Sequence, residues 1–169
     1  MKDLVVGRGR GDEPRSQGNL SAPSHRAWGA LLRSHAHFTR AVERQLEAQG
    51  LLSLEAYDVL LALSYAPGGR LRMGELFERV TLSRSGLTRL VDRLERDGYV
   101  AREVCPGDRR SFEAMLTSKG EAERARCWPL YAEVVAQEFG RLFSDEEAGV
   151  LAELLERAFG NAPLSCDGK

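Results

Sequence analysis

The most informative stretch of this chain for chemistry is TLSRSGLTRLVDRLERDG, residues 81–98. Its apolar residues recur at steps of three and four, which predicts a helix over residues 83–97 with one buried face. Six polar and basic residues lie mostly outside that face: Ser83, Arg84, Ser85, Thr88, Arg89 and Arg93. A DNA major groove accepts one α-helix, and its base edges and phosphates are bound by arginine, serine and threonine side chains. We therefore expect these six residues to contact DNA.

The same helix also carries Asp92, Glu95 and Asp97, so a solvated surface of ion pairs is the alternative interpretation. For Arg96, and in part for Arg93, that alternative is the better one. At the helix start it is weaker, because the unpaired backbone amides there also favour phosphate. We expect Asp92 to be a structural partner of Arg89, Arg93 or Arg96, and not a catalytic group.

A second basic group lies in CPGDRRS, residues 105–111, where Pro106-Gly107 predicts a turn and Asp108 precedes Arg109 and Arg110. The flanking segments, residues 99–105 and 111–117, both alternate in polarity. Two alternating segments joined by a turn predict a β-hairpin, with the two arginines at its tip.

Other chemistry has little support. The chain contains no P-loop, GxSxG or HExxH motif, so we expect no enzyme activity and no cofactor. Its cysteines, Cys105, Cys127 and Cys166, have no metal-binding spacing, and we expect free thiols in a reducing compartment. We also expect no metal at the histidines, because His35 lies on an apolar helix face.

Composition sets the broad class. Hydrophobic residues make up 43% and charged residues 29% of the chain, a balance typical of globular proteins. The net charge of −1 argues against coating nucleic acid by bulk charge, but it allows a local basic surface. No apolar segment reaches the roughly 18 residues of a membrane span, and we see no secretory signal, so we expect a cytoplasmic protein with no membrane partner.

The remaining elements are predicted to be mainly helical. A flexible tail over residues 1–23 precedes a long helix that is capped by Ser24 and ends at Gly50. Helices are then expected at 53–65 and 71–80, before the helix and hairpin described above. A further long helix begins at Thr117 or Ser118, and Pro129 is expected to kink or divide it. The pair Ser144 and Glu147 predicts a capping box at the start of the last helix, before a second tail at 161–169.

In order, these motifs resemble the DNA-binding lobe of the MarR family of bacterial transcription regulators. The resemblance rests on Leu87–Glu95, Gly98, Asp108–Arg110, Leu116-Thr117 and Gly120. It implies a mainly α fold with a small β-hairpin wing, in a MarR-like domain over residues 24–160. Within that domain, residues 53–117 form a winged helix-turn-helix lobe whose wing covers residues 99–117. Residues 24–52 and 118–160 form dimerisation helices, so the resemblance implies a homodimer on a near-palindromic operator.

The resemblance also implies roles for the hairpin tip and for a ligand. Asp108 pairs with an arginine and holds the tip in shape, while one of Arg109 and Arg110 enters the minor groove; we favour Arg110. A small aromatic or phenolic effector is expected in a cleft between the lobe and the dimerisation helices. The candidate residues for that cleft are Trp28, Leu32, His35 and Tyr57. For most of them, ordinary core packing is the better interpretation.

The prediction is thus a ligand-responsive repressor that binds double-stranded DNA as a homodimer. Two alternatives remain. One is a redox-responsive regulator that uses Cys105 or Cys127. The other is a winged-helix protein-interaction module that does not bind DNA.

Overall fold

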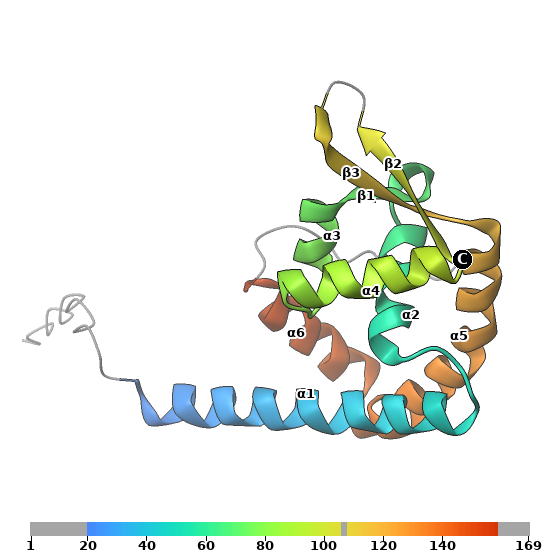
Figure 1. The fold of residues 1–169 in the computed structure, drawn as a ribbon. Helices are drawn as coiled ribbons and strands as arrows, with labels where there is room; N and C mark the ends of the chain where they lie inside the picture. The colour runs from blue at the N-terminus through green and yellow to red at the C-terminus, as the bar shows by residue number, and fades with distance from the viewer. Residues whose placement is uncertain (1–19, 106–107, 159–169) are drawn as a thin grey trace, which may run out of the picture. The chain divides into compact units, whose positions relative to one another are not determined.

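The structure is a computed structural model that describes residues 20–105 and 108–158, without the side chains of residues 105 and 108–111. The elements follow in the order α1 (Ala22–Ala48), α2 (Leu54–Ser64), η1 (Pro67–Gly69), β1 (Arg70–Arg72), α3 (Met73–Arg79), α4 (Arg84–Arg96), β2 (Val100–Cys105), β3 (Asp108–Leu116), α5 (Ser118–Glu138), η2 (Gly140–Leu142) and α6 (Asp145–Glu156) (Figure 1). The predicted class, mainly α with a β-hairpin, is confirmed.

The chain divides into two units, residues 1–35 and residues 36–169. In the first unit, α1 begins at Ala22 and not after Ser24, so the predicted cap is wrong. Ser21 takes that role, because its hydroxyl accepts a hydrogen bond from the Ser24 backbone amide at 3.3 Å. Pro23 then lies in the first turn, where a missing amide removes no helical hydrogen bond.

A three-stranded antiparallel sheet lies in the second unit, in the order β1-β3-β2. The hairpin of β2 and β3 was predicted, but β1 was not. The helix predicted over 71–80 is wrong at its start, because residues 70–72 pair with β3 and α3 begins only at Met73. Three residues are too few to show an alternating pattern, and only Leu71 among them is buried.

Two buried clusters hold the second unit together, and α2 contributes to both. The first cluster packs α2 against α3, α4 and the sheet, and its fully buried members include Leu60, Leu63, Leu76 and Val91. The second packs α2 against α1 and α5, through Ala41, Val42, Leu46, Tyr57, Cys127 and Val134. Ser53 caps α2 by accepting from the Ala56 amide at 3.3 Å.

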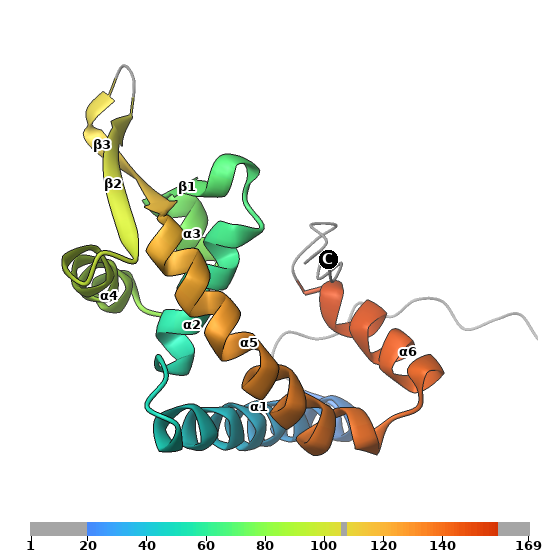
Figure 2. The same ribbon diagram turned by 90° about the vertical axis from the view of Figure 1, so that its right-hand side faces the viewer.

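The hairpin leads directly into α5 at its base (Figure 2). Pro129 lies inside α5 and does not divide it, so that part of the prediction is wrong. Burial of Cys127 and Val134 on either side offsets the lost hydrogen bond. The helix ends at Glu138, and Leu142 and Phe143 lie beyond its end.

The capping box that was predicted for α6 is present. The Ser144 hydroxyl accepts from the Glu147 amide at 3.3 Å, and the Glu147 carboxylate accepts from the Ser144 amide at 2.9 Å. Within the described part of the chain, no helix is both long and apolar enough to cross a membrane.

Candidate nucleic-acid interface

The predicted division of α4 into a buried and an exposed face is confirmed. Leu87, Leu90, Val91 and Leu94 are buried. The six polar and basic residues singled out from the sequence, Ser83, Arg84, Ser85, Thr88, Arg89 and Arg93, are all exposed. Ser83 caps the helix, since its hydroxyl accepts from the Gly86 amide at 3.1 Å. The start of α4 thus presents hydroxyl and guanidinium groups beside unpaired backbone amides.

The fold holds two of these arginines along the protein surface. The Arg89 side chain donates from Nε to the Ser85 carbonyl at 3.2 Å. The Arg84 guanidinium lies 4.3 Å from the centre of the Phe77 ring, a cation–π contact to α3 that sequence reasoning missed. Neither arginine forms an ion pair with a described residue. Their charges are therefore not neutralised by any described carboxylate.

Asp92 has a different partner from those predicted. Its carboxylate lies 2.5 Å from the Arg102 guanidinium of β2, and Glu95 lies 3.4 Å from the same nitrogen. Pairing with Arg89, Arg93 or Arg96 is wrong, and Arg93 and Arg96 form no ion pair with any described residue. The sequence offered only neighbours on the same helix, whereas the partner comes from the following strand. The only indication in the sequence was the alternating polarity of residues 99–105. That alternation places Arg102 on the same side of the strand as the apolar Val100.

The end of α4 is joined to the start of α5 by a tight junction. Thr117 donates from Oγ1 to the Gly98 carbonyl at 2.8 Å and accepts from the Gly120 amide at 3.0 Å. Lys119 donates from Nζ to the Asp97 carbonyl at 2.6 Å. A Cβ atom at Gly120 would lie only 2.1 Å from the Tyr99 carbonyl oxygen, so only glycine fits there. Close packing at Gly120 and the hydrogen bonds of Thr117 therefore explain why the Leu-Thr-x-x-Gly motif has these residues.

Charges from β1 hold the stem of the hairpin. Glu103 and Glu113 stand opposite each other on β2 and β3. Arg70 lies 3.4 Å from Glu103 and 4.0 Å from Glu113, and Arg72 lies 3.9 Å from Glu113. These arginines offset the repulsion between the two facing carboxylates.

The tip of the hairpin is described only in its backbone. Asp108, Arg109 and Arg110 belong to β3, and Asp108 is paired with Cys105 of β2. Their side chains lie outside the described part of the structure, as do Pro106 and Gly107. The orienting role of Asp108, and the choice between the two arginines, stay predictions.

The four residues proposed for an effector cleft have different surroundings. Tyr57 is fully buried, and its hydroxyl has no hydrogen-bond partner among the described residues. Burial raises the pKa of that hydroxyl well above its ordinary value. Trp28 and Leu32 are 57% and 51% exposed, and His35 is also exposed. These three belong to the unit of residues 1–35 and Tyr57 to the other, so a cleft shared by all four stays a prediction.

Sequence reasoning missed an aromatic group on α5 beside Tyr57. The Tyr131 ring centre lies 4.8 Å from that of Tyr57, and Trp128 stacks on Tyr131 with centres 6.0 Å apart. Cys127 on the same helix is fully buried, and burial raises the pKa of its thiol. A raised pKa disfavours the reactive thiolate, which weakens the redox alternative at Cys127. The Cys105 side chain lies outside the described residues.

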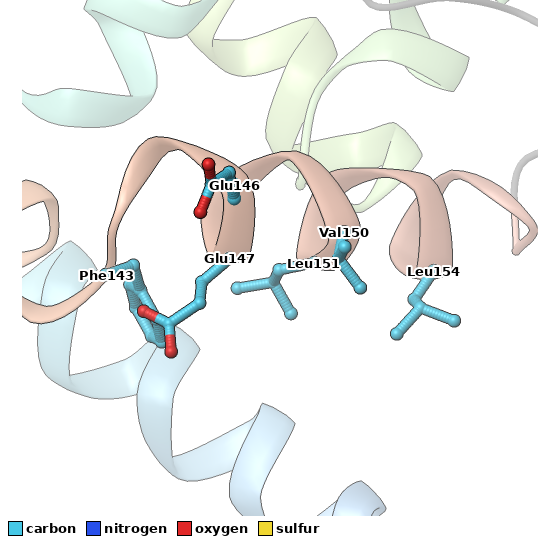
Figure 3. A pocket seen from close by; sticks show the side chains of 6 residues that line it. All are labelled: Phe143, Glu146, Glu147, Val150, Leu151 and Leu154. Carbon is cyan, nitrogen blue, oxygen red and sulfur yellow. The ribbon is translucent and has the colours of Figure 1, made fainter.

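A separate open hollow of about 410 Å³ lies along α6 (Figure 3). Phe143, Glu146, Glu147, Val150, Leu151 and Leu154 line it. Val150 and Leu154 are 57% and 50% exposed, so this face of the helix is apolar and open to solvent.

Comparison with known proteins agrees with this arrangement. A sequence model of the MarR family matches residues 49–111, from the end of α1 into the hairpin. The regulator YkoM of Bacillus subtilis is 33% identical over 99 residues, which cover 59% of this chain and 63% of YkoM. The chain thus spans less than two thirds of the length of that relative. The transcriptional repressor YetL of Bacillus subtilis is 27% identical over 141 residues, 83% of each chain.

A solved structure extends the match to nearly the whole chain. Sco3205 of Streptomyces coelicolor, a MarR-family regulator in complex with DNA, is 29% identical, with a TM-score of 0.74. The match covers 90% of this chain and 96% of Sco3205. The chain belongs to the MarR family of transcriptional regulators. As a member of this family the chain has a winged helix-turn-helix fold, in which we expect α4 to be the recognition helix and the β2–β3 hairpin to be the wing.

Proposed function

We propose that this MarR-family protein is a ligand-responsive repressor that binds a near-palindromic operator as a homodimer. The observation that carries the proposal is the exposed start of α4. Arg84 and Arg89 there have no carboxylate partner among the described residues, and Ser83 and Ser85 stand beside unpaired amides. Sco3205, whose fold is similar, has been solved with DNA, and the relative YetL is a repressor.

The proposed contacts follow from what each side chain can donate. Arg89, one turn into the helix, reads a base edge in the major groove, and Arg93 lies one turn further on the same side. Ser83, Arg84, Ser85 and Thr88 contact phosphates or bases at the edge of the groove. At the wing tip, Arg110 enters the minor groove, where a narrow A·T-rich segment attracts arginine most strongly. Asp108 orients the tip together with Arg109.

Homodimerisation is supported by apolar surface that one chain leaves uncovered. Large exposed apolar side chains are found on α1, at Trp28, Leu31 and Leu32, and on α6, at Val150, Leu154 and Leu155. Contiguous apolar surface of this kind usually marks a protein interface. A two-fold dimer would present two copies of α4 to successive major grooves of a near-palindromic site.

An effector site is supported by Tyr57. A buried hydroxyl without a partner costs about 1–3 kcal/mol, and a ligand with a polar group would relieve that cost. The Tyr131 ring next to it favours an aromatic or phenolic ligand. Such a ligand would weaken DNA binding by favouring a conformation whose two recognition helices do not match the operator.

The proposal is tested by fluorescence anisotropy with a labelled duplex from upstream of the protein's own coding sequence. The affinity should fall steeply as salt rises from 50 to 200 mM, by roughly 10³-fold or more, because bound phosphates release their counterions. A winged-helix module that binds only proteins would give no change in anisotropy even at the lowest salt. That result would contradict the proposed function.

A further inference from the structure

We propose that Arg102 is a positioning residue that fixes the angle between the recognition helix α4 and the wing, through its ion pairs with Asp92 and Glu95. The inference rests on the proposed operator binding, since the angle matters only if both elements meet DNA together. It also explains why a carboxylate lies on a helix that faces phosphates.

The ion pairs join α4 and the wing at one atom, Nη1 of Arg102. Arg102 lies on β2, two residues after the buried Val100, and its side chain is 23% exposed. Its Nη1 lies 2.5 Å from the Asp92 carboxylate and 3.4 Å from that of Glu95. Because Asp92 and Glu95 are three residues apart, they lie on the same face of α4 and reach one guanidinium.

The charges of α4 explain why this cation has to come from outside the helix. The C-terminal end of a helix carries a partial negative charge, which disfavours carboxylates there. Asp92 and Glu95 lie in the second half of α4, and Arg93 and Arg96 of the same helix pair with neither of them. Arg102 is the partner that the structure gives to both.

The position of the ion pairs suggests their use. Asp92 lies three residues after Arg89 on α4, and Arg102 lies on the strand that runs to the wing tip. A link at this point leaves the start of α4 exposed while it restrains the wing against the helix. Fixing two DNA-binding elements in advance reduces the entropy that is lost when both bind at once. The restraint that Asp92 provides therefore compensates for the repulsion between its carboxylate and the DNA phosphates.

The test uses a duplex that the wild-type protein enriches from a random pool, with a scrambled duplex of the same length beside it. Asp92→Asn separates two expectations of opposite sign. Simple electrostatics predicts tighter binding, because a negative charge is removed near DNA. The positioning role predicts roughly tenfold weaker binding to the enriched duplex, with binding to the scrambled duplex unchanged or tighter.

Three further variants sharpen the measurement. Arg102→Met should lower the affinity for the enriched duplex to a similar extent, and Arg102→Lys, which keeps the cation, by less. The double variant Asp92→Asn/Arg102→Met should bind no worse than the weaker single variant, because both changes break one link. Arg126→Met is the matched control, because Arg126 pairs with Glu123 at 2.6 Å within α5 and its loss should leave the affinity unchanged.

Melting temperatures are measured for every variant, so that loss of folding is not mistaken for loss of positioning. If Asp92→Asn melts as the wild type does and binds the enriched duplex as tightly or more tightly, the inference is overturned while operator binding stands. Equal loss on both duplexes would also overturn it, because positioning affects only the specific complex. If the wild type enriches no duplex at low salt, the proposed function fails and the inference fails with it.

Discussion

At the scale of single residues, the polar side chains of α4 differ in what the fold does with them. Asp92 is held by Arg102, whereas Arg84 and Arg89 have no described carboxylate partner. The sequence could predict the cap at Ser83 and the exposure of the arginines, because both follow from local spacing. The partner of Asp92 could not be predicted in this way, because it comes from a different element.

Arg89→Ala should weaken operator binding by about 1–3 kcal/mol if the side chain reads a base. The loss should be larger on the enriched operator than on a scrambled duplex, because a base contact contributes only to specific binding. Anisotropy titrations at one fixed salt concentration measure both values.

Arg96→Ala is the control for this change. It removes the same charge from an exposed residue at the other end of α4, where we expect no base contact. Equal effects of the two variants on the enriched operator would contradict the proposed role of Arg89.

Gly120→Ala should destabilise the fold by about 2 kcal/mol or more, because its Cβ would lie 2.1 Å from the Tyr99 carbonyl oxygen. Gly74→Ala in α3 is the matched control. Nothing lies within 4 Å of a Cβ at Gly74, and alanine there should stabilise by about 0.5–1 kcal/mol. Urea denaturation at one protein concentration gives both values, and a neutral Gly120→Ala would show that the junction is looser than described.

At the scale of elements, α2 carries Asp58 at a position where its surroundings disfavour the charged carboxylate. Glu43 of α1 accepts from the Leu54 amide at the start of α2 at 2.6 Å, and Asp58 lies one turn further along. Burial, together with the charges of Glu43 and Glu55, raises the pKa of Asp58 to about 6. The folded protein therefore holds this proton more tightly than the unfolded chain does, where an aspartate titrates near pH 4.

Asp58 should contribute stability that is fully present below about pH 4 and is lost as the pH rises through about 6. Asp58→Asn should remove this loss, so that at pH 7.5 the variant is more stable than the wild type by roughly 1–3 kcal/mol. Urea denaturation from pH 4 to pH 8 measures the effect, with the exposed Asp97→Asn as control. If the wild type and Asp58→Asn change in parallel over this range, Asp58 is not the group responsible.

Elements were predictable where their signal is local. The apolar face of α4, the alternating pattern of the hairpin and the capping box of α6 all depend on residues that are close together in the sequence. The strand β1 was missed because its three residues are fixed by pairing with β3, more than forty residues later. The prediction that Pro129 divides α5 failed for a related reason, since packing against α1 and α2 outweighs the local cost of a proline.

At the scale of the whole molecule, α1 and α6 have apolar surfaces that remain exposed to solvent in a single chain. Leu154→Glu should shift the protein from a dimer towards a monomer, because a buried leucine contributes about 1.5–3 kcal/mol and a buried unpaired carboxylate is costly. Sedimentation velocity at several concentrations measures the change. Glu153→Gln, on the exposed polar side of α6, is the control. A mass unchanged by Leu154→Glu would place the interface elsewhere.

The central claim is that two copies of α4 read one operator. Selection from a pool of random duplexes, followed by sequencing, tests it most directly. We expect enrichment of an inverted repeat whose half-site centres lie about 10–10.5 base pairs apart, or a multiple of that spacing. Enrichment of a single asymmetric motif, or of no motif at all, would contradict it.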